Sequence, residues 1–148
     1  MYLGSDPDQN NVVNDVAIRY GSPARNNFTL VAQAREGIPV AAFFDLLDIT
    51  GLSQAELASL LDVSAKTMTR YRQEGKKLNA LNSEQVLKII VLYQKGLEVF
   101  GSLSSFNRWV RKPAFGLHGS IPIHFMQTSG GIDLIFEELI RLEYGALA

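Results

Sequence analysis

The stretch between residues 64 and 77 concentrates hydrogen-bond donors. If residues 65–72 form a helix, side chains at i, i+1, i+4 and i+5 share one face, and these positions hold Ala65, Lys66, Thr69 and Arg70. A guanidinium can donate two hydrogen bonds to guanine, and an ammonium can contact guanine or a phosphate. We therefore expect this face to read the edges of nucleic-acid bases.

Positive charge is concentrated in the same stretch. Between residues 64 and 77 a single acidic residue, Glu74, opposes the basic residues Lys66, Arg70, Arg72, Lys76 and Lys77. The whole chain has a formal net charge of −1. A local basic patch in a near-neutral chain is typical of a DNA-contacting module rather than of a general nucleic-acid coat. We expect Lys76, in the loop after the helix, to contact a phosphate.

The surrounding segment has the pattern of a helix-turn-helix. Ser53 and Glu56 have the spacing of a capping box, which predicts one helix from about residue 54, and Ser64 can cap the next helix. The second helix would present its outer face to the major groove while the first crosses the phosphates. Gln54, near the start of the first helix, is expected to contact a phosphate.

The segment resembles the phage-repressor class of helix-turn-helix. Gln54, the small residue Ala58 and the apolar residue Val63 stand at matching places, whereas Asp62 occupies the turn position that is usually glycine. Aspartate tolerates a left-handed backbone better than most residues, so we expect the turn to form. The alternative is a helical hairpin of a core bundle whose charges are only solvated.

Composition limits the classes that remain. The chain has 148 residues and 47% hydrophobic residues, which predicts one or two folded domains. It has no cysteine, which excludes disulfides and thiol nucleophiles. Its apolar runs are far shorter than the roughly 20 residues that a membrane helix needs, and no signal peptide is recognisable. We expect a cytoplasmic protein that does not interact with membranes.

No set of residues predicts catalysis. His118 and His124 lie six positions apart around a proline rather than at the i, i+4 spacing of a metal-binding helix. Glu137 and Glu138 are adjacent and cannot face one site from one helix. We expect no metal, no cofactor and no enzymatic activity.

The patterning predicts an all-α fold. Residues 1–27 are polar and rich in turn formers, so we expect a mobile arm. Residues 28–81 are assigned to the helix-turn-helix domain and residues 82–148 to a helical domain. The further helices are expected at 28–35, 39–49, 84–100, 103–112, 121–128 and 132–144.

Two details of the second domain matter for function. The helix 84–100, capped by Asn82 or Ser83, has two apolar faces, so we expect a second subunit or another partner to cover the side that includes Val91 and Leu92. The last helix is expected to end at Gly145, which leaves an apolar tail of Ala146, Leu147 and Ala148.

An ordered set of residues in the second half resembles the C-terminal toxin-binding domain of Xre antitoxins, from bacterial RES-Xre toxin-antitoxin systems and related parS-type antitoxins. The set is Phe106, Trp109, Pro113, Leu117, Gly119, Pro122, Thr128, Gly131 and residues 141–145. The resemblance implies a homodimeric antitoxin that binds the operator of its own promoter. It also implies masking of the active site of a RES-type toxin that consumes NAD or transfers groups from it.

Under this resemblance we expect the toxin to be bound by Trp109, Tyr144, Gly145 and the tail Ala146, Leu147 and Ala148, with the tail entering the toxin's cleft. Leu147 departs from relatives that carry a bulkier or aromatic residue there. The alternative is a simple phage-type transcription repressor whose second half only dimerises.

Overall fold

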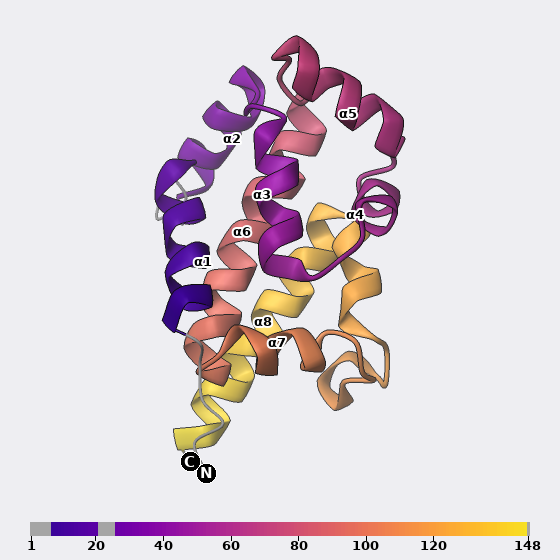
Figure 1. The fold of residues 1–148 in the computed structure, drawn as a ribbon. Helices are drawn as coiled ribbons and strands as arrows, with labels where there is room; N and C mark the ends of the chain where they lie inside the picture. The colour runs from indigo at the N-terminus through magenta and orange to yellow at the C-terminus, as the bar shows by residue number, and fades with distance from the viewer. Residues whose placement is uncertain (1–6, 21–25, 148) are drawn as a thin grey trace.

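The computed structural model describes residues 7–20 and 26–147, and within these ranges every regular element is helical (Figure 1). The expected all-α fold is confirmed. The elements are α1 (Pro7–Arg19), α2 (Asn27–Glu36), α3 (Ala41–Thr50), α4 (Gln54–Leu60), α5 (Ala65–Glu74), α6 (Ala80–Phe100), α7 (Leu103–Trp109), the 3₁₀ helices η1 (Phe115–Leu117) and η2 (Pro122–Gln127), and α8 (Ser129–Leu147).

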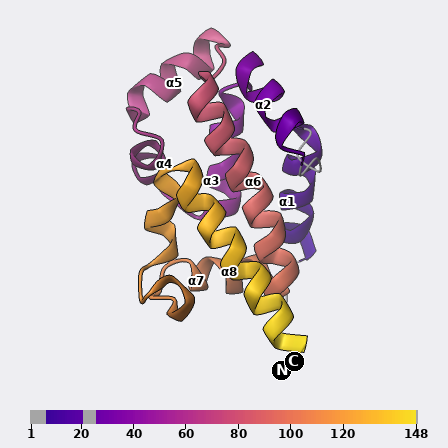
Figure 2. The ribbon, with the colours of Figure 1, turned by 180° about the vertical axis from the view of Figure 1, so that it is seen from behind.

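The long helix α6 is the axis of the fold. It packs against α1, α2, α3, α7 and α8, as Figures 1 and 2 show from opposite sides. Leu87, Ile90 and Tyr93 from α6 are fully or almost fully buried in one continuous core. Because both halves of the chain share this core, α6 fixes how the helix-turn-helix sits relative to the last helix.

The two apolar faces of α6 are covered by helices of the same chain. Leu92 is fully buried, and Val91 is half-buried beside a groove that α2 and α8 border. The expectation that a second subunit covers this face is therefore wrong. The sequence reading failed because it left α1 out of the core and so underestimated how much of the chain packs around α6.

Residues 7–20 are part of that core. Val13, Val16 and Ala17 of α1 are buried against α6 and α3. The Tyr20 hydroxyl donates a hydrogen bond to Asp45 of α3 at 2.5 Å, and Arg19 pairs with the same carboxylate at 2.9 Å. The expected mobile arm is thus wrong for residues 7–20, and residues 1–6 and 21–25 of that arm lie outside the described part of the chain.

Two helix starts differ from expectation. α6 begins at Ala80, where Asn79 is the cap and its side chain accepts from the Asn82 amide at 2.8 Å. Asn82 and Ser83, expected as caps, are instead buried within the first turns. α8 begins at Ser129, and Gly131 allows a close approach, since a Cβ there would overlap the Phe125 carbonyl.

The last helix also continues further than expected. α8 runs through Gly145 to Leu147, so Gly145 lies inside the helix and does not end it. A Cβ at Gly145 would meet nothing within 4 Å, and no following segment makes the chain reverse there. The separate apolar tail is therefore wrong for residues 146–147, which form the last turn of α8, while Ala148 lies outside the described residues.

Candidate functional site

The turn between α4 and α5 is built by side chains that cap both helices. Ser53 accepts from the Glu56 amide at 3.1 Å, and the Glu56 carboxylate accepts from the Ser53 amide at 3.0 Å. These hydrogen bonds lower the pKa of Glu56. Ser64 caps α5 by accepting from the Thr67 amide at 2.9 Å. Asp62 adopts the expected left-handed backbone, with φ of 55°, so the helix-turn-helix is formed as predicted.

α5 presents the predicted contact face outward. Met68 is buried beneath it, whereas Lys66, Thr69 and Arg70 are exposed. Ala65 is half-buried against the core at the start of the helix. Three of the four predicted readers thus share an accessible face, and the small side chain of Ala65 would let a ligand come close to the helix N-terminus.

Gln54 and Thr69 are brought together across the two helices. The Gln54 side-chain amide donates to the Thr69 hydroxyl at 3.0 Å, and that hydroxyl also donates to the Ala65 carbonyl at 3.2 Å. Gln54 therefore joins the start of α4 to the outer face of α5. This bond places the predicted phosphate contact directly beside the predicted base contacts.

The loop after α5 is held against the segment before α3. Backbone hydrogen bonds join Val40 to Lys76 at 3.2 Å and Leu78 to Ile38 at 2.9 Å. Lys76 is exposed and its ammonium pairs with Glu74 at 2.9 Å. A phosphate contact by Lys76 would therefore have to compete with Glu74. Such an exposed pair is worth little.

Two buried amides in α6 were not recognised from the sequence as part of this site. Asn82 donates from Nδ2 to the Leu61 carbonyl at 2.9 Å. Gln85 donates from Nε2 to the carbonyls of Leu60 at 2.8 Å and Met126 at 3.0 Å. They satisfy carbonyls at the end of α4, which lack helical partners. The available signal was a pair of amides three residues apart in an otherwise apolar helix.

The residues expected to bind a toxin lie in different surroundings. Trp109 is half-buried, with its ring stacked on Phe106 at 6.0 Å between centroids and tilted against Phe100 at 5.5 Å. Tyr144, by contrast, is 67% exposed, and Gly145 is exposed beside it. Trp109 thus belongs partly to the core, and Tyr144 is the accessible aromatic residue near the end of α8.

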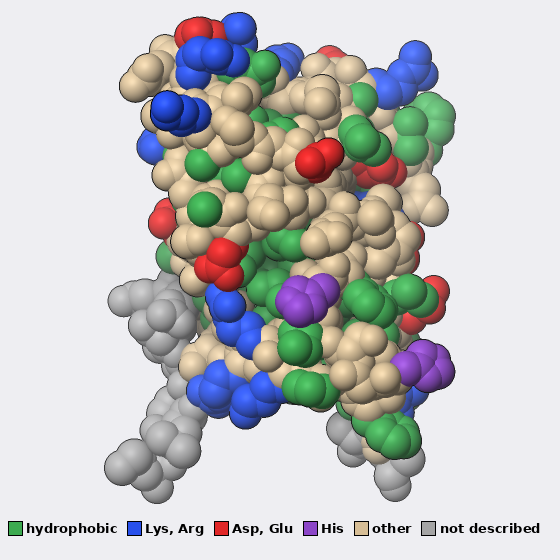
Figure 3. All heavy atoms as spheres, turned by 90° about the vertical axis from the view of Figure 1, so that its right-hand side faces the viewer, with side chains coloured by type: hydrophobic (Ala, Val, Ile, Leu, Met, Phe, Trp, Pro, Cys, Tyr) green, Lys and Arg blue, Asp and Glu red, His purple; other side chains and the backbone are tan. Residues whose placement is uncertain are grey.

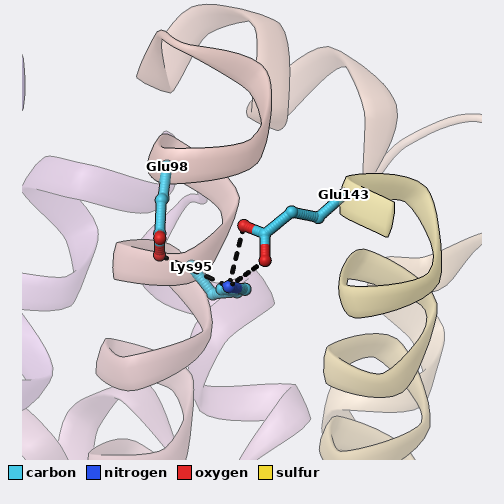
Figure 4. A network of polar contacts seen from close by, with 3 residues as sticks. All are labelled: Lys95, Glu98 and Glu143. Atoms are coloured by element: carbon cyan, nitrogen blue, oxygen red, sulfur yellow. Dashed lines mark hydrogen bonds and ion pairs between the residues drawn. The ribbon is translucent and has the colours of Figure 1, made fainter. Parts of the chain in front are cut away.

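A buried ion pair fixes the end of α8. Lys95 of α6 is almost fully buried, and its ammonium lies 2.9 Å from both carboxylate oxygens of Glu143 and 3.5 Å from Glu98 (Figure 4). Glu143 directly precedes Tyr144. The pair therefore sets the direction in which Tyr144 and the last turn leave the body of the protein.

Comparison with known families is decisive for both halves. Residues 29–91 match the antitoxin Xre-like helix-turn-helix domain. Residues 95–145 match the antitoxin Xre/MbcA/ParS C-terminal toxin-binding domain. The chain belongs to the Xre-type antitoxins. No curated protein matches it.

The family assignment gives both surfaces of the antitoxin a role. The matched helix-turn-helix domain includes α4 and α5 with all the predicted DNA contacts, and the matched toxin-binding domain includes Trp109, Tyr144 and Gly145. Neither matched family is a family of enzymes. Within the described ranges, no helix is long and apolar enough to cross a membrane, and no cluster of three potential metal ligands occurs.

Proposed function

We propose that this antitoxin neutralises a RES-type toxin that consumes NAD, by binding the toxin and masking its active site, and that it represses its own promoter. The observation that carries the proposal is the presence of an intact helix-turn-helix and a toxin-binding domain around one shared helix, α6. The RES class itself rests on the ordered set of residues between Phe106 and Gly145.

On the DNA side, Arg70 and Lys66 read bases, with Ala65 and Thr69 lying against the floor of the major groove. Gln54 and Lys76 hold phosphates on either side. The exposure of Lys66 and Arg70 and the bond between Gln54 and Thr69 support this arrangement. The antitoxin acts as a homodimer on the operator, since a two-fold site requires two reading helices about one turn of DNA apart. Operator DNA and toxin are both encountered in the cytoplasm.

On the toxin side, the last turn of α8 is presented to the active-site cleft. Tyr144 and Gly145 are exposed there, and Ala146, Leu147 and Ala148 complete the end of the chain. Since residues 146–147 are helical, we propose that they enter as a helix end rather than as an extended tail. Trp109 supports this surface from α7 through its stacking on Phe106.

The test separates the two activities. The product of the adjacent gene is co-expressed with the antitoxin, and complex formation, toxin activity and cell growth are measured beside binding to the promoter. The proposal expects a stable complex, loss of NAD consumption and restored growth. A chain that binds the promoter but neither binds nor inhibits the neighbouring product would be a simple repressor.

A further inference from the structure

The loop from Ala114 to Ser120 is a closed, ordered turn. The Ala114 amide donates to the Ser120 carbonyl at 2.9 Å, and the Gly119 amide donates to the Ala114 carbonyl at 2.9 Å. His118 and Gly119 both have positive φ, of 56° and 78°. These bonds close the loop around η1, so the side chain at its tip is held in a defined place.

The loop is also anchored to the body on both sides of that tip. Leu117 is buried in the core. Gly116 lies directly against the carboxylate of Glu138 in α8, where any Cβ would overlap it, and Glu138 is itself buried and paired with Arg141. The side chain between these anchors and Ala114 is Phe115, which is 97% exposed. A large apolar ring thus stands free on a rigid support.

The surroundings of Phe115 carry one sign of charge. Residues 99–132 contain no Asp or Glu, but include Arg108, Arg111 and Lys112, which are all exposed. Figure 3 shows Lys and Arg side chains gathered at two opposite ends of one face. The second basic group therefore favours an acidic ligand.

This second group is distant from the DNA-reading helix. α5 precedes α6 and α7 follows it, and the two lie toward opposite ends of α6 (Figure 1). The 21 residues of α6 span about 30 Å at the helical rise of about 1.5 Å per residue. A protein ligand on the second group would leave α5 open to DNA.

We propose that Phe115, with Arg108, Arg111 and Lys112 beside it, is a docking surface for the toxin, in addition to the end of α8. The inference rests on the proposed function and adds the chemistry of the partner: the toxin presents an apolar pocket for the ring, bordered by carboxylates. An aromatic side chain on a rigid loop loses little conformational entropy when it is buried, and such residues dominate binding at interfaces. Complementary charge around it speeds association.

The first test is the affinity of the purified neighbouring-gene toxin for full-length antitoxin variants, measured by calorimetry. Phe115→Ala is expected to weaken binding by at least about tenfold. Phe28→Ala is the matched control, because Phe28 is 82% exposed and lies outside both matched segments. Its affinity should equal that of the unmodified chain, and thermal melting should be unchanged for both variants, since neither ring is in the core.

The second test reverses charge. Arg111→Glu with Lys112→Glu should slow association and reduce its dependence on salt, whereas Lys66→Glu should reduce promoter binding only. Unchanged toxin affinity in both the Phe115 and the charge-reversed variants overturns the docking surface while the proposed function stands. An unmodified chain that fails to bind the toxin overturns both. Loss of DNA binding, with toxin binding intact, would assign the second basic group to nucleic acid instead.

Discussion

Lys95 and Glu143 form a two-pronged contact between the middle of the fold and the end of the last helix, with both carboxylate oxygens 2.9 Å from the ammonium. The lysine side chain is 6% exposed and the glutamate side chain 31%. The two partners therefore depend on each other unequally. The carboxylate can reach water if the lysine is removed, whereas the ammonium cannot.

This asymmetry makes a stability prediction. Glu143→Gln leaves the buried ammonium with the more distant carboxylate of Glu98, at 3.5 Å, and is expected to cost about 1–3 kcal/mol in the free energy of unfolding. Lys95→Met should cost less, because the stranded carboxylate is partly solvated. The double variant Lys95→Met with Glu143→Leu should lie near the stability of the unmodified chain. Urea unfolding of the three variants provides the comparison, and equal losses for both single variants would contradict it.

A second prediction concerns Gln85, whose amide joins the end of α4 to η2. Gln85→Met keeps the length of the side chain but leaves the Leu60 and Met126 carbonyls without this donor. We expect a loss of about 1–3 kcal/mol and weaker promoter binding, since α4 is less firmly placed. Gln127→Met is the control, because it changes an exposed side chain of η2 and keeps the backbone; it should alter neither quantity. Full promoter affinity in Gln85→Met would show that the amide does not position the reader.

Gly96 provides a third test, at the crossing of α6 and α7. A Cβ at this glycine would overlap the ring of Phe106, which is fully buried. Alanine in a helix interior normally stabilises by roughly 0.5–1 kcal/mol relative to glycine, but here we expect Gly96→Ala to destabilise by about 1–3 kcal/mol through overpacking. Gly130→Ala in α8 meets nothing within 4 Å and should be neutral or stabilising. Thermal melts that rank the two variants the other way would refute the close approach.

The fourth prediction is a pH dependence from the contact between α1 and α3. Burial and the hydrogen bond to Asp45 raise the pKa of Tyr20 from about 10 to about 12. Because the folded-state pKa is raised, its contribution to stability is fully present below pH 10 and is lost as the pH rises from about 10 to about 12. Tyr20→Phe should lack this component. Ultraviolet titration should find one tyrosine with a midpoint near pH 12 that is absent from Tyr20→Phe, and an unchanged titration would contradict the contact.

The sequence predicted the helix-turn-helix well because its signals are local. Ser53, Glu56 and Ser64 act within three residues of their positions, and Asp62 adopts the backbone expected of a turn residue. The same locality explains the errors. Asn82 looks like a cap until its long-range partner, the Leu61 carbonyl, is known. The buried residues of α1 follow polar turn formers that suggested an arm.

Sequence spacing gave less information about the second half. Trp109 and Tyr144 were chosen by resemblance, and only the fold separates them into a half-buried and an exposed aromatic residue. The exposure of Phe115 depends on Gly116 meeting Glu138 across a loop and a helix. Spacing along the chain cannot reveal such a contact. Which of these residues touch a toxin stays a prediction.

The most direct measurement of the central claim is a gel-shift titration with promoter DNA, the antitoxin and the neighbouring-gene toxin in one tube. We predict that the antitoxin shifts the DNA, and that added toxin shifts this complex further, because the toxin-binding surface and α5 lie apart. Arg70→Ala should abolish both bands on the promoter, while the toxin–antitoxin complex still forms in solution. A toxin that leaves the antitoxin–DNA band unchanged, and that shows no complex with the antitoxin in the absence of DNA, would contradict the account.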